Sequence, residues 1–175
     1  MTRINSSVLL RAAVATLFGV VGVLAQSQLP STSVSAFKLT VDGDVGKALR
    51  LSLADLAQLP RRELRAKEHD GSEHIYVGAA LADVLRPAGV QFGDKLRGEN
   101  LAMFLVVQAA DRYRAVFALP ELDPGFTDNQ VILAYSRDGQ PLSEKDGPVR
   151  IVAPNEKRQG RWVRQVIALT IRRAQ

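Results

Sequence analysis

The stretch Gly147–Ile171, GPVRIVAPNEKRQGRWVRQVIALTI, decides how the rest of the chain is interpreted. Two apolar runs in it, Val149–Ala153 and Val166–Ile171, predict strands. Residues 145–175 carry eight basic side chains against two acidic ones, a net charge of +6, whereas residues 26–144 carry 13 against 16, a net charge of −3. The basic character is therefore concentrated around a loop between two strands, and such a loop suits an anionic or planar ligand.

Residues 1–25 have the pattern of a secretory signal peptide. Arg3 and Arg11 supply positive charge, Ala12–Leu24 is largely apolar, and Ala25 suits cleavage by signal peptidase. The apolar run is shorter than the roughly 18–20 residues that span a bilayer, so an uncleaved anchor is the lesser alternative. We expect an exported, periplasmic protein, with residues 26–36 as a flexible lead-in and residues 37–172 as one domain.

Composition excludes several kinds of site. The chain has no cysteine and only two histidines, His69 and His74, so it predicts neither disulfides nor a metal centre built from thiolates or several histidines. No phosphate-binding glycine loop, G-x-S-x-G elbow or H-E-x-x-H motif occurs. A serine triad would have to use one of the two histidines, which their charged surroundings predict to be exposed loop residues. Residues 26–175 carry 21 basic against 18 acidic side chains, so nucleic acid is not expected as a partner.

Hydrophobic periodicity predicts about eight short strands and two or three short helices. This is an α+β fold with a mixed, mostly antiparallel β-sheet. Ser52 is the expected N-cap of a short helix, and Arg61–Glu68 is an expected edge strand. We interpret Gly78 as a turn into a second helix, Ala79–Leu85. The most apolar run, Leu101–Ala109, predicts a central strand buried on both faces.

The loop in the first stretch holds the main candidate ligand residues. Lys157, Arg158 and Arg161 are crowded together with only Glu156 as a counter-charge. They would be a solvated surface if they had no function. Trp162, the only tryptophan, would either anchor the loop on the core or present a ring face to a flat heterocycle.

Asp111 and Tyr113 form a second candidate group at the start of a strand, in A-A-D-R-Y-R-A-V-F. They are either turn residues beside a solvated strand face, or a carboxylate and a phenol that hold a ring with neighbouring N–H groups. Glu121 and Asp123 fit a helix-start charge pattern better than a ligand site.

Six short motifs occur in a fixed order along the chain. They are L-T-V-D-G-D-V, L-S-L-A-D-L-A-Q-L-P, Y-V-G-A-A-L-A-D-V-L-R-P-A-G-V, A-D-R-Y-R-A-V-F-A-L-P-E-L-D, D-G-Q-P-L-S-E-K-D-G-P-V-R-I-V-A-P and K-R-Q-G-R-W-V-R-Q-V. From Phe37 to Ile171 this order resembles the molybdopterin-binding domain of the sulfite oxidase family, in its small exported single-domain form. The resemblance implies a mixed α+β fold with a pterin cleft lined by strand ends and by the loop before the last strand.

One departure from that family bears on mechanism. In its catalytic members a cysteine thiolate ligates molybdenum in the segment before the G-x-x-L helix, and here that segment reads R-A-K-E-H-D-G-S-E-H-I-Y-V-G. Without the thiolate, molybdenum lacks its protein ligand. The resemblance therefore extends to the fold and a pterin site but not to redox chemistry, and no metal is expected. Such cysteine-free chains are similar to periplasmic pterin-binding proteins that control a membrane enzyme of cyclic-di-GMP turnover.

Three functional hypotheses follow. The first is a non-enzymatic module that binds a tetrahydropterin-like ring and presents its loaded state to a membrane signalling partner. Trp162 or Tyr113 would stack the ring, Asp111 would accept its N–H groups, and Arg158 and Arg161 would hold its oxygen atoms. The second is an oxidoreductase subunit that carries molybdopterin, with the basic loop on the phosphate. The third is a degenerate domain that serves only protein contacts.

Overall fold

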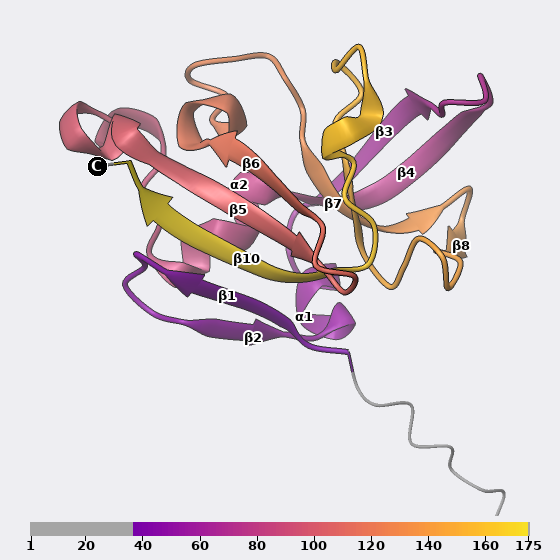
Figure 1. Cartoon of the computed structure of the whole chain (residues 1–175), viewed down its shortest axis with the longest axis horizontal. Helices are drawn as coiled ribbons and strands as arrows, with labels where there is room; N and C mark the ends of the chain where they lie inside the picture. Colours follow the sequence, from indigo (N-terminus) through magenta and orange to yellow (C-terminus); the bar gives the residue numbers. More distant parts are fainter. Residues whose placement is uncertain (1–36, 175) are drawn as a thin grey trace, which may run out of the picture. The chain divides into compact units, whose positions relative to one another are not determined.

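Two five-stranded sheets organise residues 37–174, the part of the chain that this computed structural model describes (Figure 1). The first sheet has the order β2-β1-β10-β5-β6. Its strands are β1 (Leu39–Gly43), β2 (Leu49–Leu51), β5 (Met103–Ala109), β6 (Arg114–Ala118) and β10 (Val166–Arg173).

The second sheet has the order β3-β4-β7-β8, and β9 also pairs with β7. Its strands are β3 (Arg61–Lys67), β4 (Glu73–Ala80), β7 (Ile132–Arg137), β8 (Gln140–Pro141) and β9 (Arg150–Val152). Two short α-helices, α1 (Leu53–Ala57) and α2 (Leu81–Leu85), lie in the connections. Five 3-10 turns complete the described elements: η1 (Arg86–Ala88), η2 (Gly93–Lys95), η3 (Gly98–Ala102), η4 (Leu119–Leu122) and η5 (Gln159–Arg161).

The strand pairing confirms a mixed, mostly antiparallel architecture. Only β1 and β10 pair in parallel, and the other recorded pairs are antiparallel. The strand β3 lies at an edge, as its charged sequence predicted. The division of the strands between two sheets was not predicted.

Two apolar clusters bury the second sheet on both faces. The larger contains the inward residues of the first sheet, such as Leu105 and Leu169, together with Leu133 and Ile151 of the second. The smaller covers the other face of the second sheet and includes Trp162 from the basic loop. This loop is therefore fixed to the fold by its tryptophan.

The N-cap prediction for α1 is confirmed by a capping box. The Ser52 hydroxyl accepts the Asp55 N–H at 3.2 Å, and the Asp55 carboxylate accepts the Ser52 N–H at 2.8 Å. Two of the helix's first N–H groups therefore have partners.

Two predictions about strands are wrong. Gly78 lies inside β4 and not in a turn, because a Cβ there would lie 2.2 Å from the Leu133 carbonyl oxygen of the neighbouring strand. The glycine permits close backbone approach, at a register shift between β4 and β7. In β5, buried residues such as Leu105 alternate with half-buried ones such as Val106, so only one face of this strand is fully buried.

The signal peptide and the lead-in, residues 1–36, lie outside the described residues, and their predictions remain predictions. Within residues 37–174, none of the helices has the length and apolar character needed to cross a membrane.

Candidate functional site

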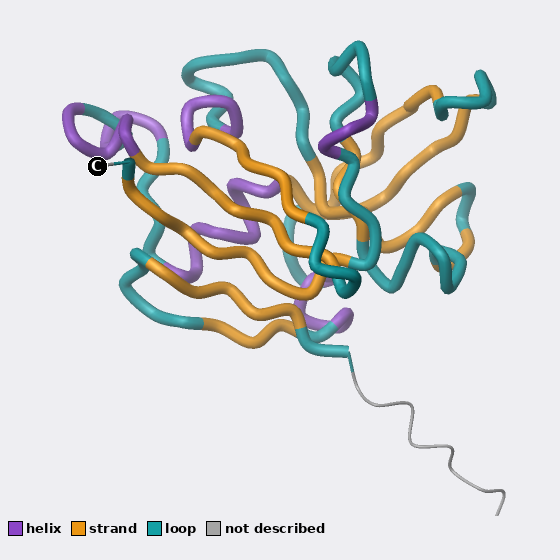
Figure 2. Tube along the Cα trace, viewed as in Figure 1, coloured by secondary structure: helices purple, strands orange, loops and turns teal. Residues whose placement is uncertain are grey.

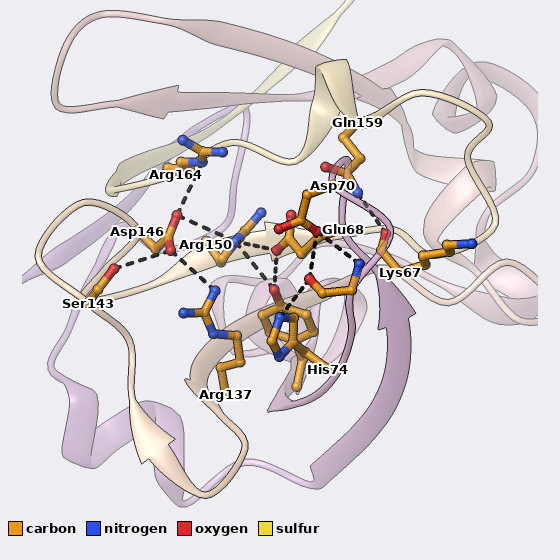
Figure 3. A network of polar contacts seen from close by, with 12 residues as sticks. Lys67, Glu68, Asp70, His74, Arg137, Ser143, Asp146, Arg150, Gln159 and Arg164 are labelled. Carbon is orange, nitrogen blue, oxygen red and sulfur yellow. Dashed lines mark hydrogen bonds and ion pairs between the residues drawn. The ribbon is translucent and has the colours of Figure 1, made fainter.

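Arg150 of β9 is the charged centre of the candidate site (Figure 3). Its side chain is almost fully buried, and its Nη1 lies 2.9 Å from Glu68 Oε1 and 3.4 Å from Asp146 Oδ1. The guanidinium also lies over the rings of Tyr76 and Trp162, at 5.4 and 5.6 Å from their centroids. A buried cation needs such compensation, because an unpaired one would be strongly destabilising.

Glu68 is held from two sides. Besides Arg150, the Tyr76 hydroxyl donates a hydrogen bond to its carboxylate. Burial, and then the hydrogen bond to Glu68, raise the pKa of Tyr76 to about 12. The phenol therefore remains a neutral donor through the physiological range.

The Asp146 carboxylate forms ion pairs with three guanidinium groups. Arg164 Nε lies 3.1 Å away, Arg150 Nη1 3.4 Å and Arg137 Nη1 3.7 Å. Figure 3 shows these cations arranged around Asp146, with Ser143 also bonded to it. Even with Glu68 on Arg150, only two carboxylates face these three cations, so this region keeps positive charge.

A first depression of about 470 Å³ opens beside this cluster. Tyr113 forms part of its wall and donates a hydrogen bond from its hydroxyl to the Gly160 carbonyl at 2.6 Å. Asp111 accepts the backbone N–H of Tyr113 at 2.8 Å. The lining residues are Ala109, Asp111, Tyr113, Lys145, Arg150, Gln159, Gly160, Trp162, Val163, Arg164 and Gln165.

A second depression, of about 800 Å³, adjoins the first. The two share Gln159, Gly160, Trp162 and Arg164, all from the segment between β9 and β10. Figure 2 shows this segment as loop apart from one short helical turn, η5. The second depression is lined by Lys67, Glu68, His69, Pro154, Glu156, Lys157, Arg158, Gln159, Gly160, Trp162 and Arg164.

The two depressions together are cationic. Six Lys or Arg side chains line them against three carboxylates. The basic ones are Lys67, Lys145, Arg150, Lys157, Arg158 and Arg164, and the acidic ones are Glu68, Asp111 and Glu156. Such a surface favours a ligand with an anionic group.

Five of the six predicted ligand residues line these depressions. Asp111 and Tyr113 line the first, Lys157 and Arg158 line the second, and Trp162 lines both. The structure therefore brings the two predicted groups together, although they are more than 40 positions apart in the sequence.

Arg161 is the exception. Its guanidinium lies 2.7 Å from Glu121 and 2.5 Å from Glu156, and 4.3 Å over the ring of Phe117. It also donates a hydrogen bond to the Val116 carbonyl at 3.0 Å. The ligand role predicted for Arg161 does not fit this geometry, because its charge is used to hold the basic loop against β6 and η4.

Trp162 acts as an anchor, one of the two alternatives raised by the sequence. Its side chain is only 5% exposed, and its Nε1 donates to the Ala153 carbonyl at 3.0 Å. Tyr76 packs edge-to-face against it, with ring centroids 6.3 Å apart. The stacking role predicted for Trp162 is therefore poorly supported, whereas Tyr113, which is 51% exposed, keeps an accessible ring.

His74 is not the exposed loop residue that was predicted. It lies in β4 with its Nδ1 2.6 Å from Asp138 Oδ2 and its Nε2 3.0 Å from Ser72 Oγ. The contacts Ser72–His74–Asp138 resemble those of a serine triad. However, the Ser72 hydroxyl donates its hydrogen to Asp70 at 2.6 Å. Because one hydroxyl hydrogen cannot serve both neighbours, the geometry favours a clasp between the β3–β4 hairpin and Asp138 over an activated nucleophile.

Sequence reasoning missed the buried part of the site, namely Arg150, Glu68 and Asp146, and the rim residues Lys145 and Arg164. Arg150 gave one usable signal. A charged residue within the apolar run V-R-I-V of a predicted buried strand requires a partner, and such partners often mark a functional site. Glu68 gave no signal, because its pairing with Arg150 joins positions 82 residues apart.

Comparisons with known proteins identify the family. A family model described as the oxidoreductase molybdopterin binding domain matches residues 26–175. This chain belongs to that family. The resemblance drawn from the six motifs, and the fold class that it implied, are thereby confirmed.

A solved structure shares the fold. It is the sulfane dehydrogenase SoxCD from Paracoccus pantotrophus, with a TM-score of 0.61 and 23% sequence identity. The match covers 77% of this chain and 38% of that chain, so the shared part is well under half of the larger protein. The search of curated protein sequences found no match.

The residues around the depressions fit the organic part of molybdopterin. Arg150 Nε is buried and has no hydrogen-bond partner among the described residues, and Arg150 lines the first depression, so a bound acceptor there could satisfy it. The basic side chains suit a phosphate. The metal part is not matched, because the chain has no cysteine, and residues 37–174 contain no group of three or more His, Asp or Glu placed to hold a metal.

Proposed function

We propose that this domain binds a reduced pterin, or the phosphate-bearing pterin of molybdopterin, in the two adjoining depressions and does not itself provide a metal-ligating thiolate. The observation that carries the proposal is the continuous cationic lining around Arg150, with a carboxylate and a phenol at its rim. Family membership supports a pterin as the ring.

Each group has a specific role in this proposal. Lys157 and Arg158 hold the anionic or carbonyl oxygens, because they line the second depression and are exposed. Asp111 accepts the ring N–H groups, and Tyr113 supplies the stacking face. Arg150 forms the rigid floor, since its own charge is already compensated by Glu68 and Asp146.

An oxidoreductase subunit is the second candidate, and membership of the molybdopterin-binding family favours it. Bound molybdopterin would supply the redox chemistry, while the chain would hold the pterin and phosphate through the same residues. Metal analysis of protein isolated from its native host separates the two candidates. Stoichiometric molybdenum supports the oxidoreductase, and pterin without molybdenum supports the binding module.

Binding can be measured directly with tetrahydrobiopterin under anaerobic conditions. Because Trp162 is the only tryptophan and borders both depressions, its fluorescence should change on binding. The double variant Lys157→Ala/Arg158→Ala should bind roughly tenfold or more weakly. The matched control Arg61→Ala/Arg65→Ala removes two exposed cations from β3 and should bind normally.

Two results would contradict the proposal. One is unchanged fluorescence together with no heat of binding in calorimetry. The other is equal affinity for the wild type and the Lys157→Ala/Arg158→Ala variant. That result would show that these two cations are solvated surface residues without a role in binding. The degenerate-domain hypothesis would then be favoured.

We also propose that the protein is exported and signals to a membrane enzyme of cyclic-di-GMP turnover. The support is the signal-like sequence of residues 1–25 and the similarity of this cysteine-free chain to periplasmic pterin-binding proteins. Fractionation of the native host, with intact-mass measurement, should recover a periplasmic species that begins near Gln26. A cytoplasmic full-length species would contradict export.

A further inference from the structure

The face of the first sheet that points away from the core carries a defined pattern of residues. Strand register places Arg50 of β2 and Arg114 of β6 in one row, through Thr40, Ala168 and Gln108. Their neighbours along the strands are buried or, in β2, half-buried against the core, apart from Ile167 at a register shift in β10, so the five residues share the opposite face. We call this side the outer face of the first sheet.

The centre of the outer face is apolar. The next two rows contain Val106 paired with Val116, and Phe104 between Arg172 and Ala118. Val116 is 49% exposed, and Phe104 and Val106 are half-buried. Neither apolar cluster of residues 37–174 includes these three side chains, so they lie outside the packed core.

The arginines around this centre differ from most others in the described chain. Nine arginines of residues 37–174 form ion pairs. Arg50, Arg114 and Arg172 are exposed, and each lacks an ion pair among the described residues, as does Arg112 in the adjoining turn. The single acid in the three rows is Asp42, which pairs in register with Thr170.

We propose that the outer face of the first sheet is a docking surface for an acidic protein, one that presents an apolar patch bordered by carboxylates. An apolar centre with arginine at its edge is the arrangement typical of protein interfaces. Four strand spacings separate Arg50 from Arg114, about 19 Å. The three rows extend about 13 Å along the strands, so the face covers roughly 250 Å². This is well below the roughly 800 Å² that each partner buries in a standard complex, so we expect a transient complex.

Charge selects this partner over two others. A second copy of the chain would bring the same arginines together, which is unfavourable. An anionic lipid surface would be expected to use more protruding apolar groups than the one large exposed side chain, Val116, found in the three rows.

The surface extends to the rim of the candidate ligand site but does not depend on it. Arg112, Tyr113 and Arg114 are consecutive, and Tyr113 lines the first depression. A partner seated on Arg114 would therefore lie beside any ligand in that depression. The docking surface goes beyond the pterin proposal, and it can be present even if no pterin binds.

Photo-crosslinking in the native host tests the location of the surface. A benzoyl-phenylalanine at Val116 is compared with one at Leu53, which is also exposed but lies in α1. The Val116 probe should give a single protein adduct, identified by mass spectrometry, that the Leu53 probe does not give. Identical adducts from both positions, or no adduct from Val116, would overturn the proposal.

The purified partner then tests the charge. Arg50→Ala/Arg114→Ala/Arg172→Ala should weaken its binding roughly tenfold or more at low salt and reduce the salt dependence. Arg61→Ala/Arg62→Ala/Arg65→Ala removes the same charge from β3 and should have little effect. Equal effects of the two triple variants would overturn the proposal.

Two further measurements identify the competing occupants. A Val116 adduct between two copies of this chain would replace the proposal with a homodimer. Tight binding to vesicles of 30% phosphatidylglycerol in phosphatidylcholine, lost in the Arg50→Ala/Arg114→Ala/Arg172→Ala variant, would replace it with a membrane surface. Pterin titration of the same variant should be unchanged, so failure of the docking surface is distinguishable from failure of the ligand site.

Discussion

Trp162 and Arg158 are four positions apart in the basic loop, yet the fold gives them opposite environments. Trp162 is buried against Tyr76 and Arg150, and Arg158 is exposed at the second depression. The sequence indicated that both belong to the site, but it did not indicate which one packs and which one faces a ligand. That distinction depends on the depth of the loop in the fold, which residue type alone does not determine.

Separate measurements of stability and binding should distinguish the two residues. Trp162→Ala should lower the free energy of unfolding by about 3–5 kcal/mol, because it empties a buried site. Arg158→Ala should leave stability nearly unchanged and weaken tetrahydropterin binding roughly tenfold, or about 1.4 kcal/mol. Denaturant unfolding and fluorescence titration check the two expectations. A stable, weakly binding Trp162→Ala variant would instead support a stacking role for the indole.

Tyr76 should give the protein a distinctive loss of stability at alkaline pH. Its pKa in the fold is about 12, above the ordinary value of 10.0, so the folded state favours the neutral phenol. The contribution of the neutral Tyr76 phenol to the free energy of unfolding is complete below about pH 10 and is lost as pH rises through about 12. Melting temperatures between pH 9 and pH 12 should therefore fall more steeply for the wild type than for Tyr76→Phe. Parallel slopes would show that Tyr76 does not ionise in this window.

At the scale of elements, the sequence predicted the strands better than their relations. Apolar runs located β9 and β10, the charged stretch Arg61–Glu68 located the edge strand β3, and the polar residue before an apolar repeat located the N-cap of α1. Gly78 was misinterpreted because a glycine needed for close strand approach and a glycine needed for a turn look the same in one sequence. The Arg161–Glu121 pair was not foreseeable either, since it joins η5 to η4 across 40 positions.

Substitution of Gly78 should disrupt the pairing of β4 with β7. The added Cβ of Gly78→Ala would meet the Leu133 carbonyl oxygen at 2.2 Å, so the strands must separate, at a cost of about 1–3 kcal/mol or more. Gly160→Ala is the matched control, because no atom lies within 4 Å of its Cβ position. Chemical denaturation checks the difference in unfolding free energy. Equal stability of the two variants would contradict the strand assignment of Gly78.

The molecule as a whole should be stable without metal. It has no cysteine, and the charge of the buried Arg150 is paired with the protein's own carboxylates, Glu68 and Asp146. Chelation should therefore shift the melting temperature by less than about 2 °C, which for a domain of this size is under ~1 kcal/mol. Thermal unfolding with and without a chelator is the measurement. A shift of about 10 °C or more would reveal a structural metal and contradict the prediction.

The parallel pairing of β1 with β10 governs when the chain can finish folding during its synthesis. Thr40 pairs with Ala168, 128 positions later, and β10 lies between β1 and β5 in the first sheet. A nascent chain still missing residues 166–173 has no strand to join its first two to β5 and β6. Contacts of such long range also slow folding. The first sheet therefore cannot close until residues 166–173 have left the ribosome, and its first two strands wait without their central partner while residues 52–165 are made.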